Sequence, residues 1–133
     1  MAPGSAGVAR GRARGGDGLR SDRSTAFYRS ALAPLGYELF VPAAGPASAV
    51  GFGTARDRLD FWLRGGTAAT PPPHFAFACA TRAVVARAYE AALAAGGAFD
   101  RAPALLAHIH PTYFAGFVRD PDGHLVELVC QAP

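Results

Sequence analysis

The sequence predicts an α+β domain in which one unit of secondary structure occurs twice. Two stretches have apolar residues at three- and four-residue steps, as in helices with one buried face. Several short stretches rich in β-branched and aromatic residues are separated by Gly and Pro, as strands are. A Pro-rich linker at 65–73 (GGTAATPPP) separates the two copies.

The length and composition fit a single domain with its own core. Of the 133 residues, 50% are hydrophobic and 17% are charged, which argues against global disorder. No apolar run approaches the ~20 residues that a membrane-spanning helix needs. Cys79 and Cys130 are too few for a disulfide framework and lack the paired spacing of a zinc site. We therefore expect reduced, buried cysteines in a cytoplasmic protein.

The positive charge is concentrated at the start of the chain. Residues 1–24 contain five Arg and two Asp, whereas residues 25–133 contain eight Arg and eight acidic residues. Residues 1–20 have no aromatic side chain and lack the apolar core of a secretory signal. We expect a flexible basic leader there, followed by one domain at 21–133. The pattern argues against a nucleic-acid groove, which would interleave aromatic and basic residues.

The first copy of the repeated unit is expected at 21–64. Ser21 or Asp22 can cap a helix with an apolar stripe, and Gly36 can end it. No convincing strand precedes this helix. Three short extended stretches follow it, near 37–41, 48–54 and 58–64.

The second copy is expected at 74–131. It opens with a strand at 74–79 (HFAFAC), after which Thr81 can cap a second helix. Gly96 and Gly97 end that helix, and a loop to about residue 110 follows.

A hairpin formed by 113–119 and 124–130 is the strongest local prediction. The sequence DPDG joins the two strands; its Pro presets the turn and its Gly takes the left-handed position. A three-residue loop of this kind places Phe117 opposite Glu127.

Alternation along the strands then assigns side chains to two faces. One face, expected to pack against the second helix, carries Phe114, Gly116, Val118, Val126, Leu128 and Cys130. The other face carries Tyr113, Ala115, Phe117, Leu125, Glu127 and Val129. The same rule leaves His74, Ala76 and Ala78 of the opening strand on this second face. His74 and Glu127 are therefore predicted to share a face.

A carboxylate among apolar neighbours needs a partner. Burying Glu127 alone would cost several kcal/mol unless it is paired, protonated or bound to a cation. One interpretation is that Glu127 lies at a rim and reaches water. The other is that His74 and Glu127, with alanines leaving space beside them, begin a divalent-metal or acid–base site.

Several segments carry a resemblance to a known family. They are SDRSTAFYRSALAPLG in the first copy and HFAFA, AYEAALAAGG and HPTYFAGFVRDPDGHLVELV in the second. They resemble the vicinal oxygen chelate superfamily, which includes glyoxalase I, bleomycin-resistance proteins and extradiol dioxygenases, over roughly 22–131. The resemblance implies paired βαβββ modules forming a curved mixed sheet with a central cavity. It also implies a homodimer and a divalent metal ion, which the sequence does not distinguish among Zn, Ni, Mn and Fe.

The resemblance also implies site residues. By position, His74 and Glu127 fall where the family places metal ligands, and Glu127 would also act in catalysis. Asp60, in RLDFWL, corresponds to Glu127 in the first module and is either a further ligand or a residue at a strand edge. The family's first ligand, a His or Gln, would fall at Gly15, which has no side chain.

Four further side chains are candidates for contact with the substrate. Tyr113 and Phe117 are expected to line the pocket, with the Tyr hydroxyl available to a polar group; simple packing in the core is the alternative. His108 and His110, in AHIHP, lie on one side of the chain. Two His at this spacing can ligate a metal, but loop histidines beside Pro are more often solvated or in contact with substrate, which we expect here. His124 has the opposite parity and is expected to be structural.

Two functions remain open from the sequence. The first is a metal-dependent enzyme, such as a lyase, isomerase or dioxygenase, that acts on a small oxygen-bearing substrate. The second is a non-catalytic protein that binds or sequesters a small molecule such as a drug. Both imply a small-molecule partner and no membrane.

Overall fold

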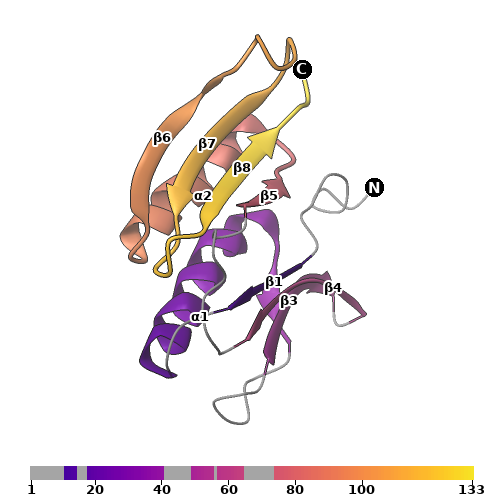
Figure 1. Ribbon diagram of the computed structural model, residues 1–133. Coiled ribbons are helices and arrows are strands. Elements are labelled where there is room, and N and C mark those ends of the chain that lie inside the picture. Colours follow the sequence, from indigo (N-terminus) through magenta and orange to yellow (C-terminus); the bar gives the residue numbers. More distant parts are fainter. Residues whose placement is uncertain (1–10, 15–17, 41–48, 56, 65–73) are drawn as a thin grey trace.

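The computed structural model describes residues 11–14, 18–40, 49–55, 57–64 and 74–133. Their strands form two four-stranded sheets, in the orders β1-β4-β3-β2 and β5-β8-β7-β6, each accompanied by one α-helix (Figure 1). This arrangement confirms the predicted α+β class with a repeated unit. In the part of the chain that is described, no helix is both long and apolar enough to cross a membrane.

The first module contains one sheet and the helix α1. Its elements are β1 (Gly11–Arg14), α1 (Gly18–Leu32), a 3-10 helix η1 (Ala33–Leu35), β2 (Glu38–Leu39), β3 (Ala49–Ala55) and β4 (Arg58–Arg64). The end of the helix agrees with the prediction, because Gly36 has a left-handed φ of 88° and donates its N–H to the Ala33 carbonyl at 2.9 Å.

The start of this module differs from the expectation. No element is expected before Ser21, yet β1 pairs in parallel with β4 and α1 begins at Gly18. The β1 sequence, GRAR, has none of the apolar alternation by which a strand is recognised. Only its parallel pairing with β4 reveals this strand, so composition could not predict it.

The second module repeats the plan. Its elements are β5 (His74–Ala78), α2 (Arg82–Ala94), β6 (Ala98–Leu105), β7 (Phe114–Arg119) and β8 (Leu125–Cys130). Helix α2 begins as predicted, because the Thr81 side chain accepts a hydrogen bond from the Val84 N–H at 3.1 Å. The strand β6 occupies a stretch where a loop is expected. It is an edge strand with mostly exposed residues and an internal Pro103, so it shows no alternation.

The hairpin forms with the predicted register. Gly123 has a φ of 89° and donates its N–H to the Asp120 carbonyl, and Phe117 lies opposite Glu127. In the same sheet β5 pairs in parallel with β8, which places Ala76 opposite Glu127 on the other side. The predicted assignment of faces is thereby confirmed for these strands.

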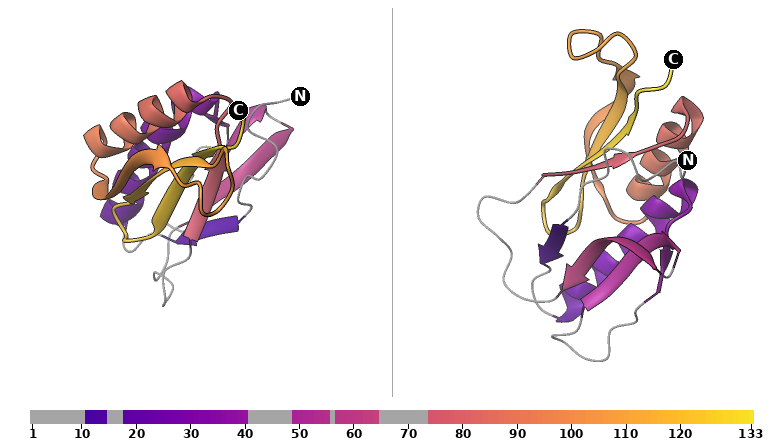
Figure 2. Two further views of the ribbon diagram at one scale, coloured as in Figure 1. Left: turned by 90° about the horizontal axis from the view of Figure 1, so that it is seen from above. Right: turned by 90° about the vertical axis from the view of Figure 1, so that its right-hand side faces the viewer.

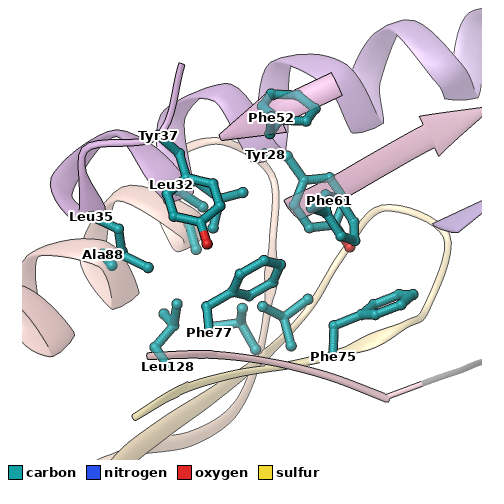
Figure 3. Packing of buried hydrophobic residues seen from close by; sticks show 14 of the residues in the cluster. Tyr28, Leu32, Leu35, Tyr37, Phe52, Phe61, Phe75, Phe77, Ala88 and Leu128 are labelled. Atoms are coloured by element: carbon teal, nitrogen blue, oxygen red, sulfur yellow. The ribbon is translucent and has the colours of Figure 1, made fainter. Parts of the chain in front are cut away.

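The two modules share one hydrophobic core. Helices α1 and α2 lie side by side (Figure 2), and α2 covers one face of the second sheet (Figure 1). The ring of Phe61, from β4, lies 5.2 Å from those of Phe75 and Phe77 in β5, centroid to centroid (Figure 3). Aromatic contacts therefore join the first sheet to the second.

A buried polar network also joins the modules. The carboxylate of Asp120, in the β7–β8 turn, accepts a hydrogen bond from the Tyr28 hydroxyl of α1 at 2.5 Å. His124 Nδ1 lies 2.7 Å from the same carboxylate oxygen. In addition, the Ser24 hydroxyl of α1 donates to Asp122 at 2.7 Å. The structural role expected for His124 agrees with its complete burial.

Both cysteines are free and buried, as expected. Burial raises the pKa of the Cys79 thiol to about 12, and the neighbouring Cys130 adds to this shift. A thiol with such a pKa is almost fully protonated at neutral pH, so Cys79 is a packing residue rather than a nucleophile.

Candidate functional site

The candidate site lies on the face of the second sheet opposite α2, which we call the helix-free face. It carries His74 and Ala76 of β5, Glu127 and Val129 of β8, and Ala115 and Phe117 of β7. Leu106, Ala115 and Val129 form a small hydrophobic cluster there, with Tyr113 and Phe117 packed against it. The face is thus apolar around one carboxylate.

Glu127 is the centre of this face. It is only 5% exposed, and each of its two carboxylate oxygens has a partner. His74 Nε2 lies 3.2 Å from Oε1, and the Tyr113 hydroxyl donates a hydrogen bond to Oε2. Sequence reasoning predicts that His74 and Glu127 share a face, and the structure brings their side chains into contact. The alternative of a rim carboxylate facing water does not describe this buried group.

Tyr113 does more than line the face, because its hydroxyl is hydrogen-bonded to Glu127. Desolvation raises the pKa of its hydroxyl to about 12, and the hydrogen bond to Glu127 and the negative charge of Glu127 add to the shift. The hydroxyl is therefore protonated at neutral pH and acts as a donor. His74, with half of its side chain exposed, is the partner of Glu127 that a ligand can reach most readily.

The structure does not bring Asp60 to this centre. The register of β3 and β4 passes from Phe52 opposite Phe61 to Gly53 opposite Leu59, which leaves Asp60 as the extra residue of a β-bulge. Its carboxylate accepts a hydrogen bond from the Tyr37 hydroxyl at 3.2 Å. The internal repeat predicts Asp60 as the counterpart of Glu127. The bulge at Asp60 interrupts the alternation of β4, so the repeat does not determine which face the Asp60 side chain is on.

His108 and His110 are exposed in the turn that follows β6. His110 Nδ1 accepts a hydrogen bond from the Thr112 N–H at 3.3 Å. Among the described residues, no contact joins either imidazole to His74 or Glu127. Their predicted contact with substrate therefore stays a prediction.

One charged residue beside the face was not identified from the sequence. The guanidinium of Arg101, on β6, lies over the ring of Phe117 with its carbon 5.9 Å from the ring centroid. Because 98–105 is expected to be a loop, sequence reasoning could not assign Arg101 to a face. Only the pairing of β6 with β7 reveals it.

The described residues do not complete a site for the metal that the resemblance implies. Catalytic metal sites normally use three or more protein ligands. Within the described ranges, no group of three or more His, Cys, Asp or Glu side chains is placed to share an ion. His74 and Glu127 supply two ligands, and both oxygens of Glu127 already have protein partners. This donor set does not fit a resident divalent ion.

A surface hollow lies elsewhere, near the C-terminal end of α2 and the β7–β8 turn. Its lining includes Arg23, Ala95 and Pro121. The carboxylate of Asp120 also borders it, but that group is engaged by Tyr28 and His124. The Asp120 carboxylate is therefore not free to bind a ligand in this hollow.

Comparison with known proteins agrees with this fold. A glyoxalase/bleomycin resistance protein from Albidiferax ferrireducens has 18% identity and a TM-score of 0.65, covering 92% of this chain and 97% of its own. A glyoxalase-related enzyme from Fulvimarina pelagi has 24% identity and a TM-score of 0.64, with 92% and 86% covered. Glyoxalase I from Zea mays has 23% identity and a TM-score of 0.62; the match covers 92% of this chain and 45% of that larger one.

These structural likenesses show the fold alone. None of the curated proteins compared with the chain matches it. The family model described as the Glyoxalase/Bleomycin resistance protein/Dioxygenase superfamily matches residues 20–128, which is most of the sequence. The chain therefore belongs to the glyoxalase/bleomycin resistance protein/dioxygenase superfamily.

Proposed function

We propose that the helix-free face binds a small organic molecule, with Glu127, His74 and Tyr113 supplying its polar contacts. In this function the protein resembles the drug-sequestering members of its superfamily. The observation that carries the proposal is that Glu127 is buried and has a protein partner at each oxygen, while within the described residues no third metal-ligating side chain is placed to share an ion with Glu127 and His74.

The surroundings of Glu127 support this function. Binding sites for small molecules are mostly apolar, with a few placed polar groups that fix the orientation of the ligand. Here the half-buried Phe117 and Ala76 provide apolar surface, and Glu127 provides the polar centre. The half-exposed imidazole of His74 offers a ring nitrogen to a hydroxyl or carbonyl group of the ligand.

Filling the space beside Glu127 is expected to block binding. Ala76 lies directly opposite Glu127 on the same face and is half-buried, so the ring in Ala76→Phe would occupy the space that a ligand needs. We expect 4-hydroxybenzamide to shift the amide resonances of Phe117 and Val129 in the parent protein. The affinity of Ala76→Phe for this probe should be lower by about tenfold or more.

The same substitution on the other side of the sheet provides the control. Ala86 is exposed on α2, so Ala86→Phe should leave the affinity unchanged. Circular dichroism establishes that both variants are folded. Equal affinities in Ala76→Phe and the parent, or shifts that cluster at the Arg23 hollow, would refute binding at the helix-free face.

A metal-dependent enzyme is the second candidate. The observation that favours it is the distance of 3.2 Å between His74 Nε2 and Glu127 Oε1, because a His and a carboxylate are common metal ligands. Such an enzyme would need further ligands from outside the described residues or from a second copy of the chain in a homodimer. The metal content of the purified protein distinguishes the two candidates.

A further inference from the structure

We propose that Arg101 makes the helix-free face selective for organic anions, by pairing with a carboxylate group of the bound molecule. This inference rests on the proposed binding function and adds the chemical class of the ligand. It follows from the position of Arg101 in the sheet, from its lack of an acidic partner and from the shape of β6.

Arg101 lies in the same cross-strand row as Glu127. Phe117 of β7 is opposite Glu127 on one side and opposite Arg101 on the other. Neighbouring strands are about 4.8 Å apart, so the Cα atoms of Glu127 and Arg101 are separated by roughly 10 Å. The Arg101 side chain bridges part of this distance, because its guanidinium lies over the Phe117 ring. A ligand the size of one aromatic ring can therefore contact both ends of the row.

Arg101 has no acidic partner among the described residues. Their ion pairs join His74 to Glu127, Arg119 to Asp100 and His124 to Asp120. Arg119 is thus neutralised by Asp100, while Arg101 makes only its contact with an aromatic face. A guanidinium in a cation–π contact over a ring face spends none of its N–H donors on that contact, so they stay available to a carboxylate.

The irregular pairing of β6 brings Arg101 to this position. The register between β6 and β7 shifts on both sides of Arg101, between Phe99 and Arg101 and again between Arg101 and Ala104. Bulges of this kind redirect a side chain and are frequent next to binding sites. Phe99 is opposite Val118, so in a regular strand Asp100 and not Arg101 would be opposite Phe117.

These features define the ligand by its chemistry. A flat apolar body would lie over Phe117, a hydroxyl group would donate to Glu127 or bond to the His74 ring, and an anionic group would pair with Arg101. The carboxylate of Glu127 would repel an anion placed beside it, so the anionic group belongs at the β6 end of the row.

Two probes of the same size test the inference. 4-Hydroxybenzoate and 4-hydroxybenzamide differ in the charge of one substituent, so the ratio of their dissociation constants isolates the contribution of the anion. At low salt we expect the parent to prefer the benzoate by about fivefold, as for a charge-assisted contact near the surface. In Arg101→Gln the ratio should fall to about one.

A matched control removes the same charge elsewhere. Arg87 is exposed on α2, on the other side of the sheet, and Arg87→Gln should keep the fivefold preference. Equal affinity of the parent for both probes, or a preference that survives in Arg101→Gln, would overturn the inference while leaving the binding function intact. If neither probe shifts a resonance on the helix-free face, the binding function fails and the inference with it.

Discussion

Replacing Asp120 by alanine is expected to lower the free energy of unfolding by about 3–5 kcal/mol. Asp120 is 4% exposed, and its carboxylate accepts hydrogen bonds from the Tyr28 hydroxyl and from the backbone N–H groups of Asp122 and His124. His124 Nδ1 contacts it as well. Alanine would leave several buried donors without an acceptor, and each such donor costs free energy. Urea unfolding measures the loss.

A more conservative change at the same position is the control for Asp120. Asp120→Asn keeps the shape and one acceptor oxygen, so its destabilisation should be smaller than that of Asp120→Ala. Because Tyr28 belongs to α1, Asp120→Ala should weaken the contact between the two modules and not only the local structure of the β7–β8 turn. A loss of less than about 1 kcal/mol in Asp120→Ala would contradict the role assigned to this network.

Replacing Phe61 by alanine is expected to destabilise the fold to a similar extent, by about 3–5 kcal/mol. Phe61 is fully buried, and its ring lies 4.7 Å from that of Tyr28 and 5.2 Å from those of Phe75 and Phe77 (Figure 3). Truncation would leave a cavity where the first sheet meets β5. Thermal and urea unfolding of the variant measure the effect.

The neighbouring residue supplies the control for Phe61. Trp62 is larger but only half-buried and has the opposite parity on β4, so Trp62→Ala should cost less than Phe61→Ala. The reverse order would show that the shared core is not centred on the aromatic cluster of Phe61.

The second module was largely predictable because its signals are local. Thr81 marks the start of α2, and the DPDG turn fixes the register of β7 and β8. Once that register is set, alternation alone places Glu127 and His74 on one face. The β6 strand lacked such signals, because an exposed edge strand needs no apolar pattern to pair.

The details of the site depended on features that alternation does not contain. Alternation assigned Tyr113 to the face of Glu127, but Tyr113 precedes β7, so the hydrogen bond between the two depends on the path of the turn before the strand. Asp60 occupies the position of Glu127 in the internal sequence repeat, but the β-bulge in β4 means that the two residues are not equivalent in the structure. Arg101 could not be recognised until β6 was known to be a strand.

The metal content of the protein purified without chelator tests the central claim most directly. We measure all first-row divalent metals by mass spectrometry in the parent and in His74→Ala. If Glu127 serves a binding site in which His74 and Tyr113 satisfy its oxygens, both proteins should contain far less than one equivalent of metal per chain. A full equivalent in the parent that is lost in His74→Ala would contradict the account and establish a metal centre at Glu127.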